Sequence, residues 1–126
     1  MSRIVIASWL ACMGFTQQTT TVWGGDHIEL QVGAKDATVD FDCAHGTIDA
    51  AIAPDSNGHF EVKGTFTAEH AGPVREDSSQ TRPATYAGTI KEDAMVLRVT
   101  PGGQDPPPPT TYELTRGRPG NVRKCR

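Results

Sequence analysis

The chain has 126 residues, a formal net charge of -3 and an isoelectric point near 5.7. Its length is typical of one domain with a core of its own, which argues against a two-domain organisation. The acidic balance provides no overall positive field that would attract phosphates, so we expect no nucleic-acid partner.

The first residues are typical of an export signal. Arg3 precedes an apolar run over 4–10, and small residues follow around Ala11 and Cys12. The run is too short to cross a bilayer as a stable helix. Three interpretations stay open: signal cleavage after Ala11 or slightly later, lipidation of Cys12 in a lipobox-like WLAC, or a buried first strand. We divide the chain into a signal segment, 1–18, and a single β-domain, 19–126.

After this segment, apolar and polar residues alternate with period two between turn residues, and no long stretch has the helical period. This pattern predicts an all-β fold. The expected strands cover 20–24, 27–33, 37–43, 47–53, 59–67, 83–91, 94–100 and 110–116. In 27–33, for example, Ile28 and Leu30 face one side while Glu29 and Gln31 face the other, as in a half-buried strand.

Most of the expected connections are short and carry hairpin signals, namely 32–37, 43–47, 54–59 with Asn57-Gly58, and 91–94. An antiparallel meander of eight strands removes its two edges most economically by closing on itself. We therefore predict an eight-stranded antiparallel up-and-down barrel of lipocalin-like type, with an open β-sandwich as the alternative. Short strands and bulky inward residues leave room for only a small cavity.

Two connections are longer than the rest. Residues 68–82 are polar and without apolar period, which indicates either a lid or a tolerated insertion. Residues 101–110 contain four consecutive prolines, which favour an extended spacer that cannot donate ladder hydrogen bonds.

The cysteine count becomes even once Cys12 is removed or lipidated. The remaining Cys43 and Cys125 form a pair in an oxidising compartment, and we predict that they are bridged. Such a bridge would tie the basic C-terminal tail to the barrel. We expect the protein to be exported to the periplasm or cell envelope, either free or lipid-anchored.

Several segments carry a family resemblance: VWGGDHIEL, VDFDCAHGTID, YELTRGRP and the terminal KC. They resemble a group of small exported or lipid-anchored bacterial β-proteins of unassigned function. The resemblance spans nearly all of the chain after residue 20 and implies export and a barrel-like fold, but no catalytic residue. Trp23 beside Gly24 is also similar to the Gly-x-Trp opening of lipocalin-like barrels, whose indole plugs one barrel end, although here no glycine stands two before the tryptophan. That likeness is architectural and says little about a ligand.

The groups that could assemble a metal site are few: His27, His45, His59 and His70, with Asp26, Asp42 and Glu69. Neighbours on a strand point to opposite faces, so Asp26 and His27 cannot share one pocket without an intervening turn. We place His45 in the tight turn before Gly46. We expect these histidines to lie on the surface or in turns, and we expect no resident metal or other cofactor.

Enzymatic chemistry is not expected from this sequence. No G-x-S-x-G elbow occurs, and the predicted bridge removes Cys43 as a nucleophile. Carboxylate pairs such as Glu76-Asp77 and Glu92-Asp93 lie in polar turns, where solvation keeps them ordinary.

Three functional hypotheses remain. The first is a non-catalytic envelope binding protein with a small apolar ligand, or a protein partner, held near an open barrel end or under 68–82. Its candidate ligand-binding residues are Trp23, His27, His45 and His70. The second is a periplasmic inhibitor or interaction protein that presents 43–47 or 68–82 to a hydrolase. The third is metal binding through His27 and His45. We expect a monomer.

Overall fold

A computed structural model describes residues 20–69 and 81–125, and these residues form eight strands and no helix. The strands are β1 (Thr21–Gly25), β2 (Ile28–Val32), β3 (Ala37–Phe41), β4 (Ala44–Ile48), β5 (His59–Ala68), β6 (Thr81–Lys91), β7 (Ala94–Pro101) and β8 (Thr110–Arg116). Each strand pairs antiparallel with the next, and β8 returns to β1, which closes the barrel. The predicted barrel is confirmed, and the sandwich alternative is wrong.

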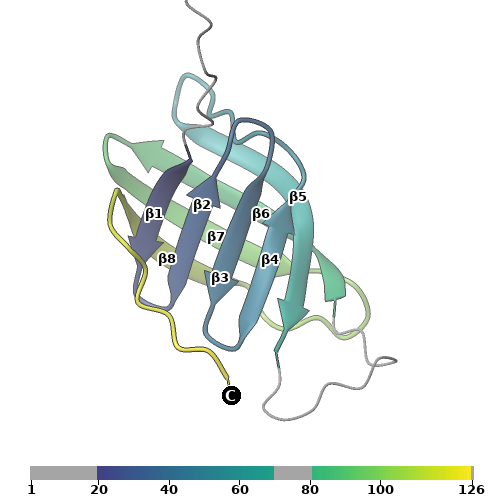
Figure 1. Ribbon diagram of the computed structural model, residues 1–126. Coiled ribbons are helices and arrows are strands. Elements are labelled where there is room, and N and C mark those ends of the chain that lie inside the picture. The colour runs from purple at the N-terminus through teal and green to yellow at the C-terminus, as the bar shows by residue number, and fades with distance from the viewer. Residues whose placement is uncertain (1–19, 70–80, 126) are drawn as a thin grey trace, which may run out of the picture.

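The four short strands β1 to β4 lie side by side in front of β6 to β8, and β5 curves round to pair with β4 (Figure 1). Strands β1 to β4 have five residues each, whereas β5 and β6 have ten and eleven. The period-two pattern explains these strands directly. In β7, buried Met95, Leu97 and Val99 alternate with exposed Val96 and Arg98.

The barrel interior is occupied by its own side chains. The largest fully buried ones are Tyr86, Ile28, Leu30, Ile48, Met95, Leu97 and Val39. Each aliphatic side chain removed from water in this way contributes roughly 1.5–3 kcal/mol. The Tyr86 hydroxyl donates to the Thr65 carbonyl across 2.6 Å, so the one polar end of that ring is satisfied. Burial raises the pKa of Tyr86 well above its ordinary value.

Seven of the eight strands agree with the sequence prediction to within two residues at each end, and β4 does not. The prediction of a strand over 47–53 is wrong, because β4 begins at Ala44 and ends at Ile48. The β3–β4 turn is Asp42-Cys43, with Phe41 opposite Ala44 and Cys43 at a φ of 54°. His45 therefore lies within β4 opposite Asp40 rather than in a turn, and 43–47 is not a protruding loop.

Residues 117–125, which we call the C-terminal strap, cross the outside of the barrel. The strap leaves β8, runs beside β1 and ends below the β3–β4 turn (Figure 1). Asn121 bonds both sides of the β1–β2 turn, accepting from the His27 N–H at 2.8 Å and donating to the Gly25 carbonyl at 3.0 Å. Gly24 permits this path, because a Cβ there would overlap the backbone of Arg118 and lie 2.5 Å from Gly120 N.

Several predicted features lie outside the described residues: the signal segment 1–18 with Cys12, most of the connection 68–82, and His70. The described part of the chain contains no helix that is long and apolar enough to cross a lipid bilayer.

Candidate binding surfaces

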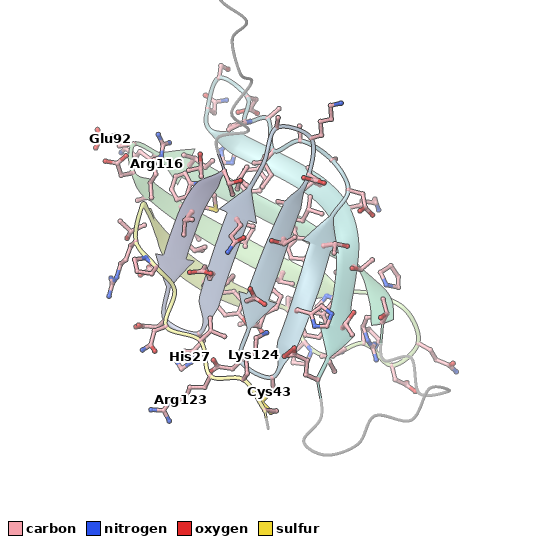
Figure 2. All side chains as sticks on the ribbon, viewed as in Figure 1. His27, Cys43, Glu92, Arg116, Arg123 and Lys124 are labelled. Atoms are coloured by element: carbon pink, nitrogen blue, oxygen red, sulfur yellow. A yellow bond between two sulfur atoms is a disulfide. The ribbon has the colours of Figure 1, made fainter. Side chains whose placement is uncertain are left out.

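The strap ends in the predicted disulfide between Cys43 and Cys125, whose Cα atoms are 4.8 Å apart. This bridge is confirmed, and it joins the β3–β4 turn to a residue 82 positions later. Disulfides persist in oxidising compartments, so the bond indicates a non-cytoplasmic environment. Figure 2 places Cys43, His27, Arg123 and Lys124 at this end of the barrel and Arg116 at the other.

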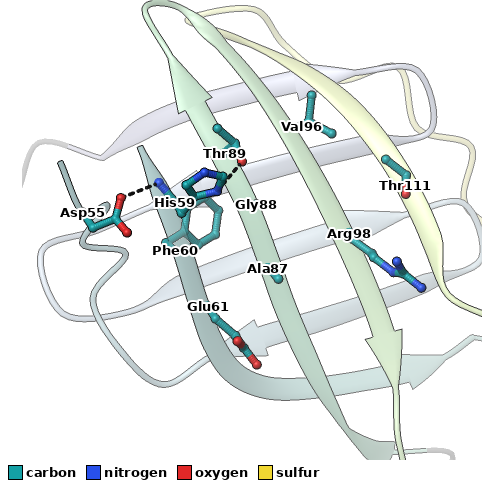
Figure 3. Close-up of a pocket in the computed structure, with 10 residues that line it drawn as sticks. All are labelled: Asp55, His59, Phe60, Glu61, Ala87, Gly88, Thr89, Val96, Arg98 and Thr111. Carbon is teal, nitrogen blue, oxygen red and sulfur yellow. Dashed lines mark hydrogen bonds between the residues drawn. The ribbon is translucent and has the colours of Figure 1, made fainter. Parts of the chain in front are cut away.

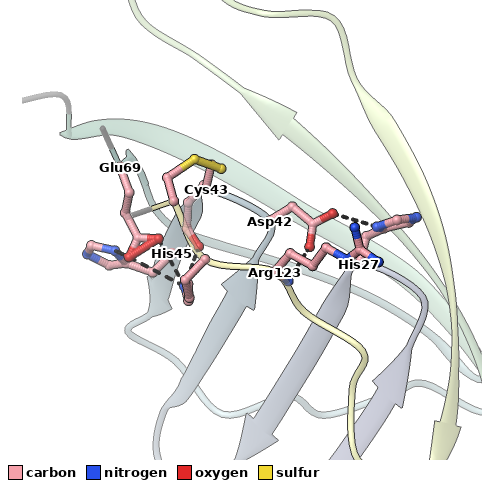
Figure 4. Close-up of a disulfide and its surroundings, with 9 residues drawn as sticks. His27, Asp42, Cys43, His45, Glu69 and Arg123 are labelled. Carbon is pink, nitrogen blue, oxygen red and sulfur yellow. Dashed lines mark hydrogen bonds and ion pairs between the residues drawn. A yellow bond between two sulfur atoms is a disulfide. The ribbon is translucent and has the colours of Figure 1, made fainter. Parts of the chain in front are cut away.

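Asp42 organises the turn beside the bridge (Figure 4). Its two carboxylate oxygens accept hydrogen bonds from the Arg123 N–H at 2.7 Å and from His27 Nδ1 at 2.5 Å. The Arg123 N–H, with a smaller contribution from His27, holds the pKa of Asp42 below its ordinary value. In addition, the Cys43 N–H donates to the Arg123 carbonyl at 3.2 Å. Asp42 therefore acts as an anchor for the strap.

Lys124 makes a second anchor. Its ammonium group donates to the Ala44 carbonyl at 2.9 Å and pairs with Asp40 at 3.0 Å and Glu69 at 3.1 Å. Partial burial acts to lower the pKa of Lys124, but the hydrogen bonds to Asp40 and Glu69 outweigh it and the pKa is raised. The contacts of Asp42 and Lys124 thus form a network at this end of the barrel that holds the strap in place.

The predicted site residues His27 and His45 take part in this network separately. His27 Nδ1 contacts Asp42, whereas His45 Nδ1 contacts Glu69 at 3.2 Å. The described residues hold no group of three or more His, Cys, Asp or Glu side chains that could hold a metal ion. Among the described residues, neither the His27–Asp42 pair nor the His45–Glu69 pair therefore has a third potential metal ligand beside it, and metal binding stays a prediction.

Trp23, the other predicted ligand-binding residue in the described part of the chain, lies inside the barrel and is 4% exposed. The Arg116 guanidinium lies over its ring, 4.8 Å from the centroid. Arg116 is held there by main-chain and side-chain contacts to Asp93 and Glu92 in the β6–β7 turn. The role of Trp23 in ligand binding stays a prediction.

The outer wall of β5 to β8 carries a groove that the sequence analysis did not predict (Figure 3). Strand register explains it, because outward residues form rows across the wall. One row reads Glu61, Ala87, Arg98 and Thr111, and the next reads His59, Thr89 and Val96. Ala87 is small and stands between two long charged side chains. The resulting depression, which we call the outer groove, has a volume of about 570 Å³.

Opposite charges border the outer groove. Glu61 and Arg98 stand two strands apart, which corresponds to about 10 Å between their backbone positions. Neither forms an ion pair with another described residue. Val96 supplies an apolar surface and is 48% exposed. His59 is held by its Nδ1 contact with Thr89 Oγ1 at 2.9 Å, and the Asp55 carboxylate accepts from the His59 N–H at 3.0 Å.

Comparison with protein-family models, with curated proteins and with solved structures finds no match to this chain. The sequence resemblance therefore stays a prediction.

The Asp42 anchor predicts a pH dependence of stability. Because the folded-state pKa of Asp42 is lowered, its stabilising effect is complete above the ordinary value of 3.8 and is lost as the pH falls through the lower folded value. We expect Asp42→Asn to reduce stability at pH 6 and to flatten the decline between pH 4 and pH 2, measured by urea unfolding. Asp49→Asn, at an exposed position after β4, is the control. Parallel curves for wild type and Asp42→Asn would contradict this anchor.

Proposed function

We propose that this protein is a non-catalytic binding protein of the bacterial cell envelope and that it holds a small zwitterionic ligand, of the size of a short peptide, in the outer groove. The observation that carries the proposal is the row Glu61, Ala87, Arg98, which sets a carboxylate and a guanidinium on either side of a shallow apolar floor. The occupied interior, with Tyr86 and Leu97 fully buried, favours an external site over an internal one.

The expected contacts follow from charge and length. A guanidinium binds a carboxylate through two parallel hydrogen bonds, so the ligand carboxylate would bind Arg98. The ligand ammonium would then face Glu61. An extended tripeptide spans about 10 Å between its termini, which matches the distance between the backbone positions of the two residues. Its central apolar side chain would rest on Ala87 and Val96.

Export and a lack of catalysis complete the proposal. The Cys43–Cys125 bridge supports an oxidising compartment outside the cytosol, and it also removes Cys43 from thiolate chemistry.

The test uses the tripeptide Ala-Leu-Ala with free termini and the same peptide acetylated and amidated. We expect the free peptide, titrated into ¹⁵N-labelled protein, to shift the amide signals of Ala87, Thr89 and Arg98, and the blocked peptide to shift none. Loss of a charge-assisted hydrogen bond costs about 1.5–3 kcal/mol, so Arg98→Gln should weaken binding by roughly tenfold or more. Ala87→Leu fills the floor and should weaken binding similarly.

Thr38→Leu, which adds bulk at an exposed outward position of β3, is the matched control and should bind as the wild type does. Equal binding of the free and blocked peptides, or shifts confined to interior residues such as Leu97, would refute the outer groove as the site. Absence of any shift with the free peptide would refute the ligand class.

A further inference from the structure

The barrel closes over a very short seam. Strands β1 and β8 pair only at Trp23 with Arg116 and at Gly24 with Thr115. β1 then ends at Gly25 and turns back, whereas the β8 segment Thr110–Glu113 continues past it. Among the described residues, no strand lies beside this segment on the side facing β1.

A groove of about 560 Å³ follows this gap, and we call it the seam groove. One wall is the β8 segment Thr110–Glu113, and the other is the β1–β2 turn with Gly24, Gly25, Asp26 and His27. Four consecutive residues of one strand line it, although their side chains alternate between the two faces of the wall. The groove therefore lies along the backbone edge of β8 rather than over one face.

The direction of the main-chain groups along β8 shows which of them reach the seam groove. The Arg116 N–H donates to the Asp93 carbonyl at 2.8 Å, on the β7 side. Because these directions alternate along a strand, the main-chain groups of Leu114 and Tyr112 also point to β7, and those of Glu113 and Thr111 point away from it. The Glu113 carbonyl lies against Gly25. The Glu113 N–H and both main-chain groups of Thr111 are thus left for a partner.

Two further features restrict what could fill the gap. Four exposed prolines precede Thr110 and cannot donate ladder hydrogen bonds, so pairing is limited to the short segment that follows them. The groove is lined by the carboxylates of Asp26 and Glu113, one on each wall, and by the guanidinium of Arg118, so carboxylates outnumber the guanidinium. None of these three groups forms an ion pair within the described part of the chain. An occupant with a basic side chain would neutralise the excess negative charge.

We propose that the β8 edge at Thr110–Glu113 is an interaction surface that accepts an extended, basic segment of a partner protein by strand addition. Main-chain hydrogen bonds to Thr111 and Glu113 extend the sheet, as in other β-augmentation sites, and a lysine or arginine of the segment lies between Asp26 and Glu113. This surface shares Thr111 with the outer groove, but it uses the main-chain edge of β8 and does not depend on the zwitterion proposal.

The probe is a synthetic octapeptide of alternating threonine and valine with one central lysine, acetylated and amidated so that it carries no terminal charges. In the free, oxidised, full-length protein we expect the Thr111 and Glu113 amides to exchange with solvent at least tenfold faster than those of Tyr112 and Leu114. Binding should slow exchange at Thr111 and Glu113 at least tenfold. A peptide with alternate amides methylated, or with glutamate in place of lysine, should bind at least tenfold more weakly.

Two variants test the two parts of the interaction. Thr111→Pro removes an N–H that the β7 ladder does not use and should abolish probe binding. Glu113→Lys should reject the lysine peptide and accept the glutamate peptide, which keeps the test decisive should Thr111→Pro fail to fold. Asp49→Lys, which also replaces a carboxylate by an ammonium group but at an exposed position outside both grooves, is the matched control and should leave probe binding unchanged.

Several results would overturn the proposal. Slow exchange of the Thr111 amide in the free protein would show that the edge is already paired. Protection that appears only with rising protein concentration would assign the edge to a second copy of this chain. Probe-induced shifts confined to Ala87 and Arg98 would assign the peptide to the outer groove.

Discussion

Replacing Cys43 or Cys125 by serine lowers the free energy of unfolding by about 4.5 kcal/mol in the chain-entropy description of a disulfide. The bond closes a loop over a sequence separation of 82 residues, so its loss returns much conformational freedom to the unfolded chain. For a domain of this size the corresponding fall in melting temperature is roughly 15 °C. Urea unfolding and calorimetry under non-reducing conditions measure both quantities.

The two single variants and the double variant should lose the same stability, because each removes the same bond. The strap remains attached to the barrel in all three through the hydrogen bonds of Asn121, Arg123 and Lys124. Deleting 119–126 should therefore cost more than the cysteine substitutions do. Cys12→Ser, which keeps both bridged cysteines, is the control and should unfold as the wild type does. Unequal losses in the two single variants would count against a purely covalent effect.

Gly46→Ala is expected to destabilise the barrel by roughly 3 kcal/mol or more. Gly46 is buried in β4, and a Cβ there would overlap the Tyr86 hydroxyl and lie 2.5 Å from the Thr65 carbonyl oxygen. Those two groups form the hydrogen bond that satisfies the buried phenol. The methyl group added by this substitution therefore both overpacks the interior and breaks a buried hydrogen bond. Each of these two effects costs about 1–3 kcal/mol.

A double-mutant cycle with Tyr86→Phe isolates this coupling. Tyr86→Phe alone should cost about 1–3 kcal/mol because the Thr65 carbonyl loses its donor. In the Gly46→Ala background the same change should cost less or restore stability, since the overlapping oxygen is removed. Gly102→Ala is the matched control: its Cβ would lie 3.4 Å from the Pro83 carbonyl, an ordinary contact, so its stability should stay within about 1 kcal/mol of the wild type. Equal costs of Tyr86→Phe in both backgrounds would disprove the coupling.

The sequence by itself determined the class of fold and most of its elements. Alternation such as Met95, Leu97, Val99 against Val96 and Arg98 depends only on neighbours in the chain, because a strand that covers a core must turn every second residue inward. The disulfide was also predictable. Once Cys12 was assigned to the signal segment, Cys43 and Cys125 were the two remaining cysteines, and an even pair in an oxidising compartment is expected to be bridged.

The position of β4 was decided by tertiary structure. The histidine and glycine at 45 and 46 are typical of a turn, yet the turn is at Asp42-Cys43. Strap contacts fix it there, because Arg123 bonds the Asp42 carboxylate and the Cys43 N–H. Gly46 is needed to make room for the Tyr86 ring. Both causes come from residues forty or more positions away, which no local pattern contains.

The two grooves also required the three-dimensional structure. Glu61, Ala87 and Arg98 come from three strands, and only the pairing register places them in one row. A shift of one residue in any of these strands would turn its side chain to the opposite face of the wall. The seam groove depends likewise on where β1 ends relative to β8. Alternation along each strand is a local property and could be predicted, whereas register and strand ends depend on contacts between distant segments.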